Sequence, residues 1–318
     1  MFLKNWIEKY IPVSSAAEPE TEPGIARAAA AIAGCEALLI GAGAGLSASA
    51  GFDYSGARFE KYFADFERAF GFHDMYSGGF CRYDTLEELW AFWSRNIWIN
   101  RYMNAPRPVY RDLLRLVRSR DYFVITTNVD HCFQKNRFDK SRLFYTQGDY
   151  GLFQCSVPCH CATYDNFEDI KRMVLAQGFA LGEGNVLQPP ASGKPKMRVP
   201  SSLIPRCPKC GKPMTMNLRT DDTFVEDKGW HAAAARYDAF CRAHETGRVV
   251  YLELGVGSNT PGIVKYPFMQ RVFKNPDALY IVLNAEPQRI PDEIAPRTVQ
   301  LVGDIGATLR ALLEASQK

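Results

Sequence analysis

The sequence lacks the features that would place the protein in a membrane or on nucleic acid. None of its 318 residues lies in an apolar run that reaches the ~18 residues of a membrane-spanning helix. Lysine and arginine form no clusters, and the net charge of +3 is small, so we expect no nucleic-acid partner. A hydrophobic content of 47% and a charged content of 23% are typical of a soluble globular protein.

The first residues also lack the marks of a secreted protein. The start MFLKNWIEKYIPVSS has no continuous apolar stretch and no small-residue cleavage site. A mitochondrial presequence fits poorly, because Glu8 is present in this start and arginine is absent. We therefore expect an intracellular, cytoplasmic protein, with a mitochondrial location as the open alternative. In such a compartment the nine cysteines are not expected to form structural disulfides.

What the sequence does contain is an alternation of short apolar runs with segments of helical spacing. The apolar runs predict strands at residues 36–40, 122–126, 249–254, 279–283 and 299–302, and the helical spacing predicts helices at 25–33, 111–118 and 305–315. Buried strands that alternate with helices are typical of the α/β class. We therefore expect a Rossmann-like, doubly wound parallel sheet.

A glycine-rich segment follows the first expected strand and reads Gly41-Ala42-Gly43-Ala44-Gly45-Leu46-Ser47. Glycine lets the backbone approach a pyrophosphate, and the amides at a helix start can bind its charge. The dehydrogenase fingerprint G-x-G-x-x-G is not met, because Leu46 stands where its third glycine should be. The segment predicts a nucleotide loop of another type; a strand-to-helix turn that binds nothing is the alternative.

Two cysteine pairs predict a structural zinc site. Cys207 and Cys210 have C-x-x-C spacing, and Cys155 and Cys159 form a second pair upstream. Four thiolates in two pairs suit a closed tetrahedral site. His160 and Cys161 adjoin Cys159, and either could replace it as a ligand; we choose Cys159. Free thiols or a C-x-x-C disulfide switch are the other interpretations.

The cysteine pairs also mark a change in composition. Proline and glycine are frequent between residues 182 and 213, and the pairs flank this stretch. This pattern predicts a smaller domain inserted into the Rossmann-like domain. We therefore divide the chain into an N-terminal segment (1–24), a Rossmann-like domain (25–150 and 247–318) and a small zinc-binding domain (151–246).

Over longer stretches, five motifs in order resemble those of the sirtuins. The segment GAGLSASAGFDYSG (43–56) is similar to their nucleotide loop, and Thr127-Asn128-Val129-Asp130 resembles their Gln-Asn-Ile-Asp motif. The other three matches are the second small-residue loop at 255–259, Asn284 at the end of the next strand, and Gly303-Asp304-Ile305. The resemblance covers nearly the whole chain.

The sequence departs from the pattern of deacylating sirtuins at positions that bear on the reaction. Gln147 stands where deacylating sirtuins carry a catalytic histidine, and none of the five histidines lies at this position. An amide can hydrogen-bond a ribose, but it cannot accept a proton near neutral pH as imidazole does. Ser55 likewise replaces an arginine that contacts the nicotinamide side, and whether Arg58 substitutes for it is open. The pattern predicts ADP-ribose transfer with little deacylation.

This combination resembles the macrodomain-linked sirtuins, called class M. Further matching stretches are residues 154–160, 217–225, 229–237 and 259–267. The resemblance implies an NAD-dependent protein mono-ADP-ribosyltransferase that consumes NAD, releases nicotinamide and contains structural Zn²⁺. It also implies an acceptor protein of the lipoyl-carrier type, similar to the glycine-cleavage H protein. A separate macrodomain hydrolase that removes the modification is the second implied partner.

The resemblance further implies a role for each matching position. Asn128 and Gln147 would be catalytic and would orient the nicotinamide ribose or the acceptor, and Asp130 would lie near the nicotinamide amide. The remaining cofactor-binding positions are Gly43, Ala44, Gly45, Ser47, Ala48, Asp53, Tyr54, Gly257, Ser258, Asn259, Asn284, Asp304 and Ile305. Two of these residues have ordinary structural alternatives: a turn cap for Asn128 and a helix N-cap for Asp304.

Two rival functions stay open on the sequence alone. A lysine deacylase could use His231 or a water as its base, and a non-catalytic sensor could bind NAD or ADP-ribose without turnover. The polar segment Arg219–Tyr237 has two interpretations as well. It could form the face that binds the acceptor, or a salt-bridge network that supports the small domain.

Overall fold

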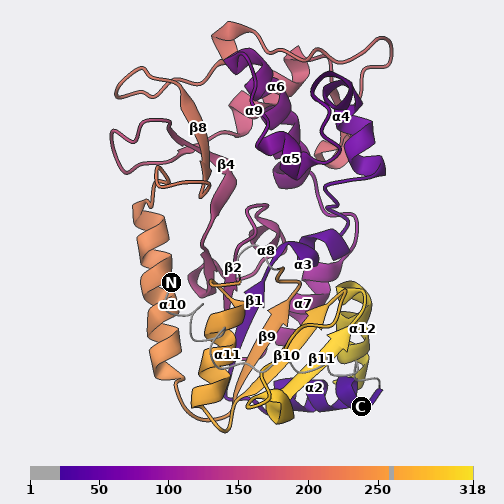
Figure 1. Ribbon diagram of the computed structural model, residues 1–318, viewed down its shortest axis with the longest axis vertical. Coiled ribbons are helices and arrows are strands. Elements are labelled where there is room, and N and C mark those ends of the chain that lie inside the picture. Colours follow the sequence, from indigo (N-terminus) through magenta and orange to yellow (C-terminus); the bar gives the residue numbers. More distant parts are fainter. Residues whose placement is uncertain (1–21, 258–260, 318) are drawn as a thin grey trace.

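The computed structural model describes residues 22–257 and 261–317, and its centre is a six-stranded parallel sheet (Figure 1). The strand order is β11-β10-β9-β1-β2-β3. The strands are β1 (Ala37–Ala42), β2 (Tyr122–Thr126), β3 (Leu143–Tyr145), β9 (Val249–Leu254), β10 (Leu279–Asn284) and β11 (Thr298–Val302). The order reverses between β1 and β9, so the crevice at their carboxyl ends is the switch point at which doubly wound sheets bind ligands. The expected fold class is confirmed.

The strands are apolar on both sides because helices cover both faces of the sheet. Leu38 and Ile40 of β1 point into one core, and Leu39 points into the other. The first core is closed by α2 (Glu22–Gly34), α3 (Ala44–Ser49), α7 (Val109–Val117), α8 (Cys132–Lys135) and α12 (Ile305–Ala315). The second is closed by α10 (Lys228–Ala243) and α11 (Lys265–Lys274). The short turns η2 (Lys140–Arg142) and η5 (Ala295–Arg297) precede β3 and β11.

A second lobe stands above the carboxyl ends of the strands (Figure 1). Its helices are α4 (Ala57–Phe70), α5 (Met75–Gly79), α6 (Leu86–Ile97), the π-helical η1 (Trp98–Tyr102) and α9 (Phe167–Ala176). Its strands are β4 (Gly148–Cys155), β5 (Tyr164–Asp165), β6 (Ala180–Leu181), β7 (Leu187–Gln188) and β8 (Met214–Leu218), with the short turns η3 (Glu183–Asn185) and η4 (Ser201–Leu203). Arg95 of α6 connects the elements of this lobe, because its buried guanidinium donates hydrogen bonds to Asp65 of α4 at 2.8 Å and to Gln177, just after α9, at 2.7 Å.

The packing departs from the expected domain limits in two places. Helices α4 to α6, expected in the Rossmann-like domain, share the core of the second lobe: the rings of Trp90 and Phe153 lie 5.0 Å apart. Helix α10, expected in the small domain, packs on the main sheet, where Trp230 contacts Phe144 at 5.1 Å between ring centroids. The apolar faces of these helices predict that the helices are buried, but they do not indicate against which of the cores the helices pack.

None of the helices in the described part of the chain is both long and apolar enough to cross a membrane.

Candidate active site

Two glycine loops meet backbone to backbone at the switch point between β1 and β9. The Gly43 amide donates to the Leu254 carbonyl at 3.0 Å, and the Gly45 amide donates to the Gly255 carbonyl at 2.9 Å. A Cβ on Gly45 would lie 2.8 Å from the Gly255 Cα, too close for any side chain. Gly255 has a φ of 60°, which favours glycine as well. Glycine at position 45, which does not belong to the dehydrogenase fingerprint, is therefore required for this contact between the two loops.

We expect Gly45→Ala to weaken NAD binding at least tenfold. The added methyl group must push the first loop away from the second, which displaces the amides at the start of α3. Isothermal titration with NAD measures the effect. Gly34→Ala is the matched control, because nothing lies within 4 Å of a Cβ at that position. Equal affinity of the two variants would contradict the placement of NAD at this loop.

Asn128 lies directly behind the first glycine loop and is 9% exposed. Its side-chain nitrogen donates to the Gly43 carbonyl at 2.9 Å and contacts the hydroxyls of Ser47 at 3.2 Å and Tyr110 at 3.3 Å. Burial raises the pKa of Tyr110 well above its ordinary value, so this hydroxyl is a neutral partner. No described residue hydrogen-bonds the Asn128 side-chain oxygen. The residue therefore braces the loop and still offers one acceptor to a ligand.

Asp130 is engaged within the protein. Its carboxylate accepts hydrogen bonds from the Ser47 hydroxyl and, at 2.9 Å, from the Cys132 amide. The side chain is 6% exposed, and it fixes the start of α8 against α3. This arrangement supports a positioning role at the base of the cleft.

Gln147 ends the turn between β3 and β4 and is half-buried. Its carbonyl accepts from the Arg219 amide at 3.0 Å. Among the residues that the structure describes, none hydrogen-bonds its side-chain amide. The amide is thus held by its backbone and is free to contact a ligand.

A charged cluster that the sequence analysis missed lies beside Gln147. Asp149 accepts from the His131 Nδ1 at 2.7 Å, from the Arg101 Nε at 2.6 Å and from the Gly151 amide at 2.7 Å. Burial by itself raises the pKa of Asp149, but the hydrogen bond from His131 and the charge of Arg101 outweigh it and lower this pKa to about 2. A small cavity of about 10 Å³ is lined by Asn128, Asp130, His131 and Asp149 among others.

This lowered pKa predicts an acid-dependent loss of stability. The Asp149 contribution is fully present above the ordinary aspartate pKa of about 3.9 and is lost as the pH falls toward about 2. At neutral pH, Asp149→Asn should cost on the order of 2 kcal/mol of unfolding free energy, and the difference from the wild type should shrink between about pH 4 and pH 2. Urea unfolding of both proteins across this range measures it; a difference that does not change with pH would contradict the assignment.

The remaining predicted contacts lie along the same edge of the sheet. Asn284 donates to the Val256 carbonyl at 3.3 Å, beside Gly257. Asp304 caps α12 through the Ala307 amide at 2.9 Å, so its structural alternative is confirmed, and it also accepts from the Ser49 hydroxyl at 2.9 Å. The Ile305 side chain is buried in the core, which leaves only its backbone for a ligand. Ser258 and Asn259 lie outside the described residues.

The loop that contains Asp53 and Tyr54 borders the second lobe. In α3, which precedes this loop, Ala44 is exposed and Ala48 is half-buried, and Asp53 in the loop is exposed. The Tyr54 hydroxyl lies 3.2 Å from that of Tyr150, and burial raises the pKa of Tyr54 well above its ordinary value. Arg58 donates to the Asp53 carbonyl at 3.1 Å, so it holds this loop in place.

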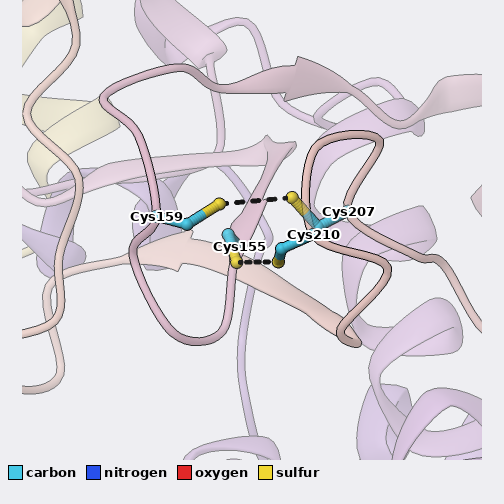
Figure 2. Close-up of side chains that lie close together, drawn as sticks. All are labelled: Cys155, Cys159, Cys207 and Cys210. Atoms are coloured by element: carbon cyan, nitrogen blue, oxygen red, sulfur yellow. Dashed lines mark hydrogen bonds between the residues drawn. The ribbon is translucent and has the colours of Figure 1, made fainter.

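The four predicted metal ligands converge (Figure 2). The sulfur atoms of Cys155, Cys159, Cys207 and Cys210 all lie within 4.8 Å of one another, with Cys155 and Cys210 3.5 Å apart and Cys159 and Cys207 3.7 Å apart. A tetrahedral site with Zn–S bonds of about 2.3 Å separates its sulfurs by roughly 3.8 Å. The donor set therefore fits a structural zinc ion.

Of the three adjacent candidates, Cys159 is the one whose sulfur lies with those of the other three cysteines. His160 is close to the cluster, with its Nδ1 3.0 Å from the Cys159 sulfur, but its Nε2 hydrogen-bonds the Tyr164 hydroxyl at 2.7 Å. Cys161 is exposed and lies outside the group of four.

The polar segment Arg219–Tyr237 forms contacts within the protein, of the kind expected for a supporting network. Arg219 pairs with Glu226 and lies over the Trp230 ring, 5.4 Å from its centroid. The Trp230 indole donates to the Thr146 carbonyl at 3.2 Å, next to Gln147. His231 is largely exposed and is 3.9 Å from Glu226. The network thus braces the Gln147 turn from outside.

Two curated proteins resemble the chain in sequence. It is 40% identical over 285 residues to a protein ADP-ribosyltransferase of Staphylococcus aureus. This match covers 89% of the chain and 85% of that relative. It is 29% identical over 300 residues to a probable bifunctional ADP-ribose hydrolase/ADP-ribosyltransferase of Fusarium oxysporum f. sp. cubense. This second match covers 89% of the chain and 46% of the longer relative. No family model matches the chain.

Solved structures of Sir2 enzymes have the same fold. One match is a Sir2 structure from a study of the mechanism and regulation of these enzymes. Its TM-score is 0.55 at 19% identity, over 93% of this chain and 99% of that one. A Sir2 complex with a p53 peptide and NAD⁺ matches with a TM-score of 0.55 at 15% identity, over 92% and 98%. The sequence relative and this fold together show that the chain belongs to the sirtuin-type protein ADP-ribosyltransferases.

Proposed function

We propose that the protein transfers ADP-ribose from NAD to a side chain of an acceptor protein and releases nicotinamide. The observation that carries the proposal is the unbonded side-chain amide of Gln147, which the sequence resemblance matches to the catalytic histidine of deacylating sirtuins. The family relationship supports the reaction class, since the relative at 40% identity is named a protein ADP-ribosyltransferase.

In this proposal NAD lies across the switch point. The amides around Gly43, Ala44 and Gly45, with Ser47 and Ala48, would face the phosphates. The adenosine half would contact Gly257, Ser258, Asn259, Asn284, Asp304 and the Ile305 backbone. Asp53 and Tyr54 would border the nicotinamide side. The contact of the two glycine loops, which leaves no space for side chains, supports this placement.

Asn128 and Gln147 would orient the nicotinamide ribose from two sides. Nicotinamide departs as a neutral leaving group, so cleavage of its glycosidic bond requires orientation and electrostatic stabilisation rather than a base on the ribose. A deacylase additionally needs a base that activates a ribose hydroxyl, and an amide cannot accept that proton. Gln147 therefore favours direct capture of the ADP-ribosyl group by an acceptor.

We further propose a lipoyl-carrier acceptor similar to the glycine-cleavage H protein, a separate macrodomain hydrolase that reverses the reaction, and a cytoplasmic location. The fungal relative is named for both a hydrolase and a transferase, which supports a functional pairing of the two activities. A cavity of about 370 Å³ near the cleft is lined by Arg107, Arg111 and Lys135 among others. Its basic lining supports an acceptor with acidic side chains.

Parallel product analysis tests this function. The protein is incubated with NAD labelled in its adenosine half, and nicotinamide release is compared with label bound to protein. We expect one nicotinamide for each attached label, and a loss of both products in Gln147→Ala. Tight NAD binding without nicotinamide release would contradict the proposal and support the sensor alternative.

A further inference from the structure

We infer that His131 is the general base that takes the proton from the acceptor group as ADP-ribose is transferred. The inference rests on the proposed function and assigns the proton-accepting role that Gln147 cannot perform. It also restricts the acceptor to a group that arrives with a proton, namely a hydroxyl, a thiol or an amine.

The imidazole of His131 is oriented as that of a base should be. Its Nδ1 lies 2.7 Å from the Asp149 carboxylate, while its Nε2 forms no hydrogen bond with any described residue. A carboxylate on one ring nitrogen fixes the tautomer and leaves the other nitrogen to accept a proton. The His131 side chain is 25% exposed, so its open nitrogen can be reached from outside the core.

Asp149 is itself held in place by a second residue. The side chain of Asp149 is 6% exposed, and its other oxygen is bonded by the Arg101 Nε at 2.6 Å. Arg101 belongs to the π-helical turn η1, a distortion that often occurs at functional sites. The carboxylate of Asp149 is thus supplied by β4 of the second lobe, and the imidazole of His131 is supplied by the loop before α8. Asp149 and Arg101 are positioning residues in this arrangement.

The position of His131 places it next to the proposed reaction centre. It follows Asp130 directly and lines the same small cavity as Asn128 and Asp149. Its φ of 62° is in the left-handed region, which a residue other than glycine seldom adopts. This conformation turns the side chain out of the line of α8 and toward β4, where it meets Asp149. An uncommon backbone geometry at a cleft is consistent with a functional constraint.

The step balances without any further reactant. The acceptor atom X of an X–H group bonds to C1′ of the nicotinamide ribose, and the C1′–N bond to nicotinamide breaks. Its electron pair leaves with nicotinamide, which departs neutral. The proton on X passes to the Nε2 of His131 and is released from there to solvent.

Charged groups surround His131 from every element packed against it. Asp149 of β4 and Asp130 in the loop before α8 are negative, whereas Arg101 of η1 and Lys135 of α8 are positive. Cys132 of α8 and Tyr145 of β3 are the other titratable neighbours. The negative charge of Asp149 stabilises the imidazolium that forms when His131 accepts the proton.

The variant His131→Gln tests the inference, since glutamine can still donate to Asp149 but cannot take a proton. The probe acceptors are a lipoylated carrier protein and, in its absence, water, scored as NAD hydrolysis. We expect transfer to both to fall 100-fold or more. The affinity for NAD, measured by isothermal titration, should stay within about twofold, because binding moves no proton.

Two controls separate this role from a structural one. His244→Gln removes another histidine that is 25% exposed and paired with an aspartate, Asp121, at 3.3 Å, and it should leave every rate unchanged. In His131→Ala, added imidazole should restore transfer. Unchanged transfer in His131→Gln, an equal fall of NAD affinity and transfer, or no rescue by imidazole would each overturn the inference. Absence of nicotinamide release by the wild type with NAD and the carrier would instead overturn the proposed function and the inference with it.

Discussion

Replacing Cys207 with serine is expected to release the zinc ion and unfold the second lobe. Cys207 is 2% exposed and stands before β8, while Cys155 ends β4, the strand that pairs with β8. The metal therefore links the end of β4 to the segment before β8 and stabilises the pairing of these two strands. Structural zinc contributes apparent binding free energies of about 10 kcal/mol or more, which equals or exceeds the whole stability of a typical domain.

The measurement combines metal analysis with limited proteolysis. The wild type should contain about one zinc per chain, and Cys207→Ser should contain almost none and be cleaved rapidly within residues 151–214. Cys161→Ser is the matched control, because Cys161 is exposed and lies outside the group of four sulfurs. A wild-type protein with less than half a zinc per chain, or a variant as resistant as the control, would contradict the zinc site.

Replacing Asn128 with alanine is expected to lower transfer at least 100-fold. The substitution removes the only amide that reaches from the end of β2 to the Gly43 carbonyl in the described structure, together with the oxygen left open for a ligand. Loss of an interaction made in the transition state is typically a 100- to 1,000-fold effect. Initial rates of label transfer at saturating NAD measure it.

The difficulty with this variant is that it also breaks hydrogen bonds within the protein, at a cost of about 1 to 3 kcal/mol in stability. Tyr110→Phe provides the comparison, because it removes a hydroxyl that contacts both Asn128 and Ser47 but presents nothing to the proposed ligand. Both variants should be destabilised, and only Asn128→Ala should lose transfer. Equal losses of activity would mean that Asn128 acts through the fold alone.

The sheet could be predicted because buried parallel strands carry their signal locally. Each of the five expected strands is confirmed within about two residues, and the helix expected at 305–315 matches α12. The strand β3 was missed, since Leu143–Tyr145 is three residues long and pairs on one side only. A run this short has no periodicity by which strand and loop can be told apart.

The candidate site was predictable only where its residues lie close together in sequence. The glycine loop and the cysteine pairs carry their chemistry in their spacing, and the structure brings the cysteines together as expected. The cluster of His131, Asp149 and Arg101 joins residues 18 and 48 positions apart, and no spacing rule links them. The one available signal was a histidine directly after the Asn-Val-Asp motif.

The membership of α4 to α6 in the second lobe could not be predicted for a related reason. Their aromatic faces predict burial, but burial against a partner that comes almost a hundred residues later in the chain is not visible locally. The structure identifies that partner, because the Tyr62 hydroxyl of α4 donates to the Leu187 carbonyl at 3.1 Å and Arg95 of α6 donates to the Gln177 side chain at 2.7 Å.

The central claim is that the protein attaches ADP-ribose to a protein rather than deacylating lysine, and one parallel incubation tests it most directly. The pure protein is given NAD labelled in its adenosine half, with a lipoylated carrier protein in one reaction and an acyl-lysine peptide in the other. We expect label on the carrier, lost in Asn128→Ala, and an unchanged peptide. A deacylated peptide with an unlabelled carrier would contradict it.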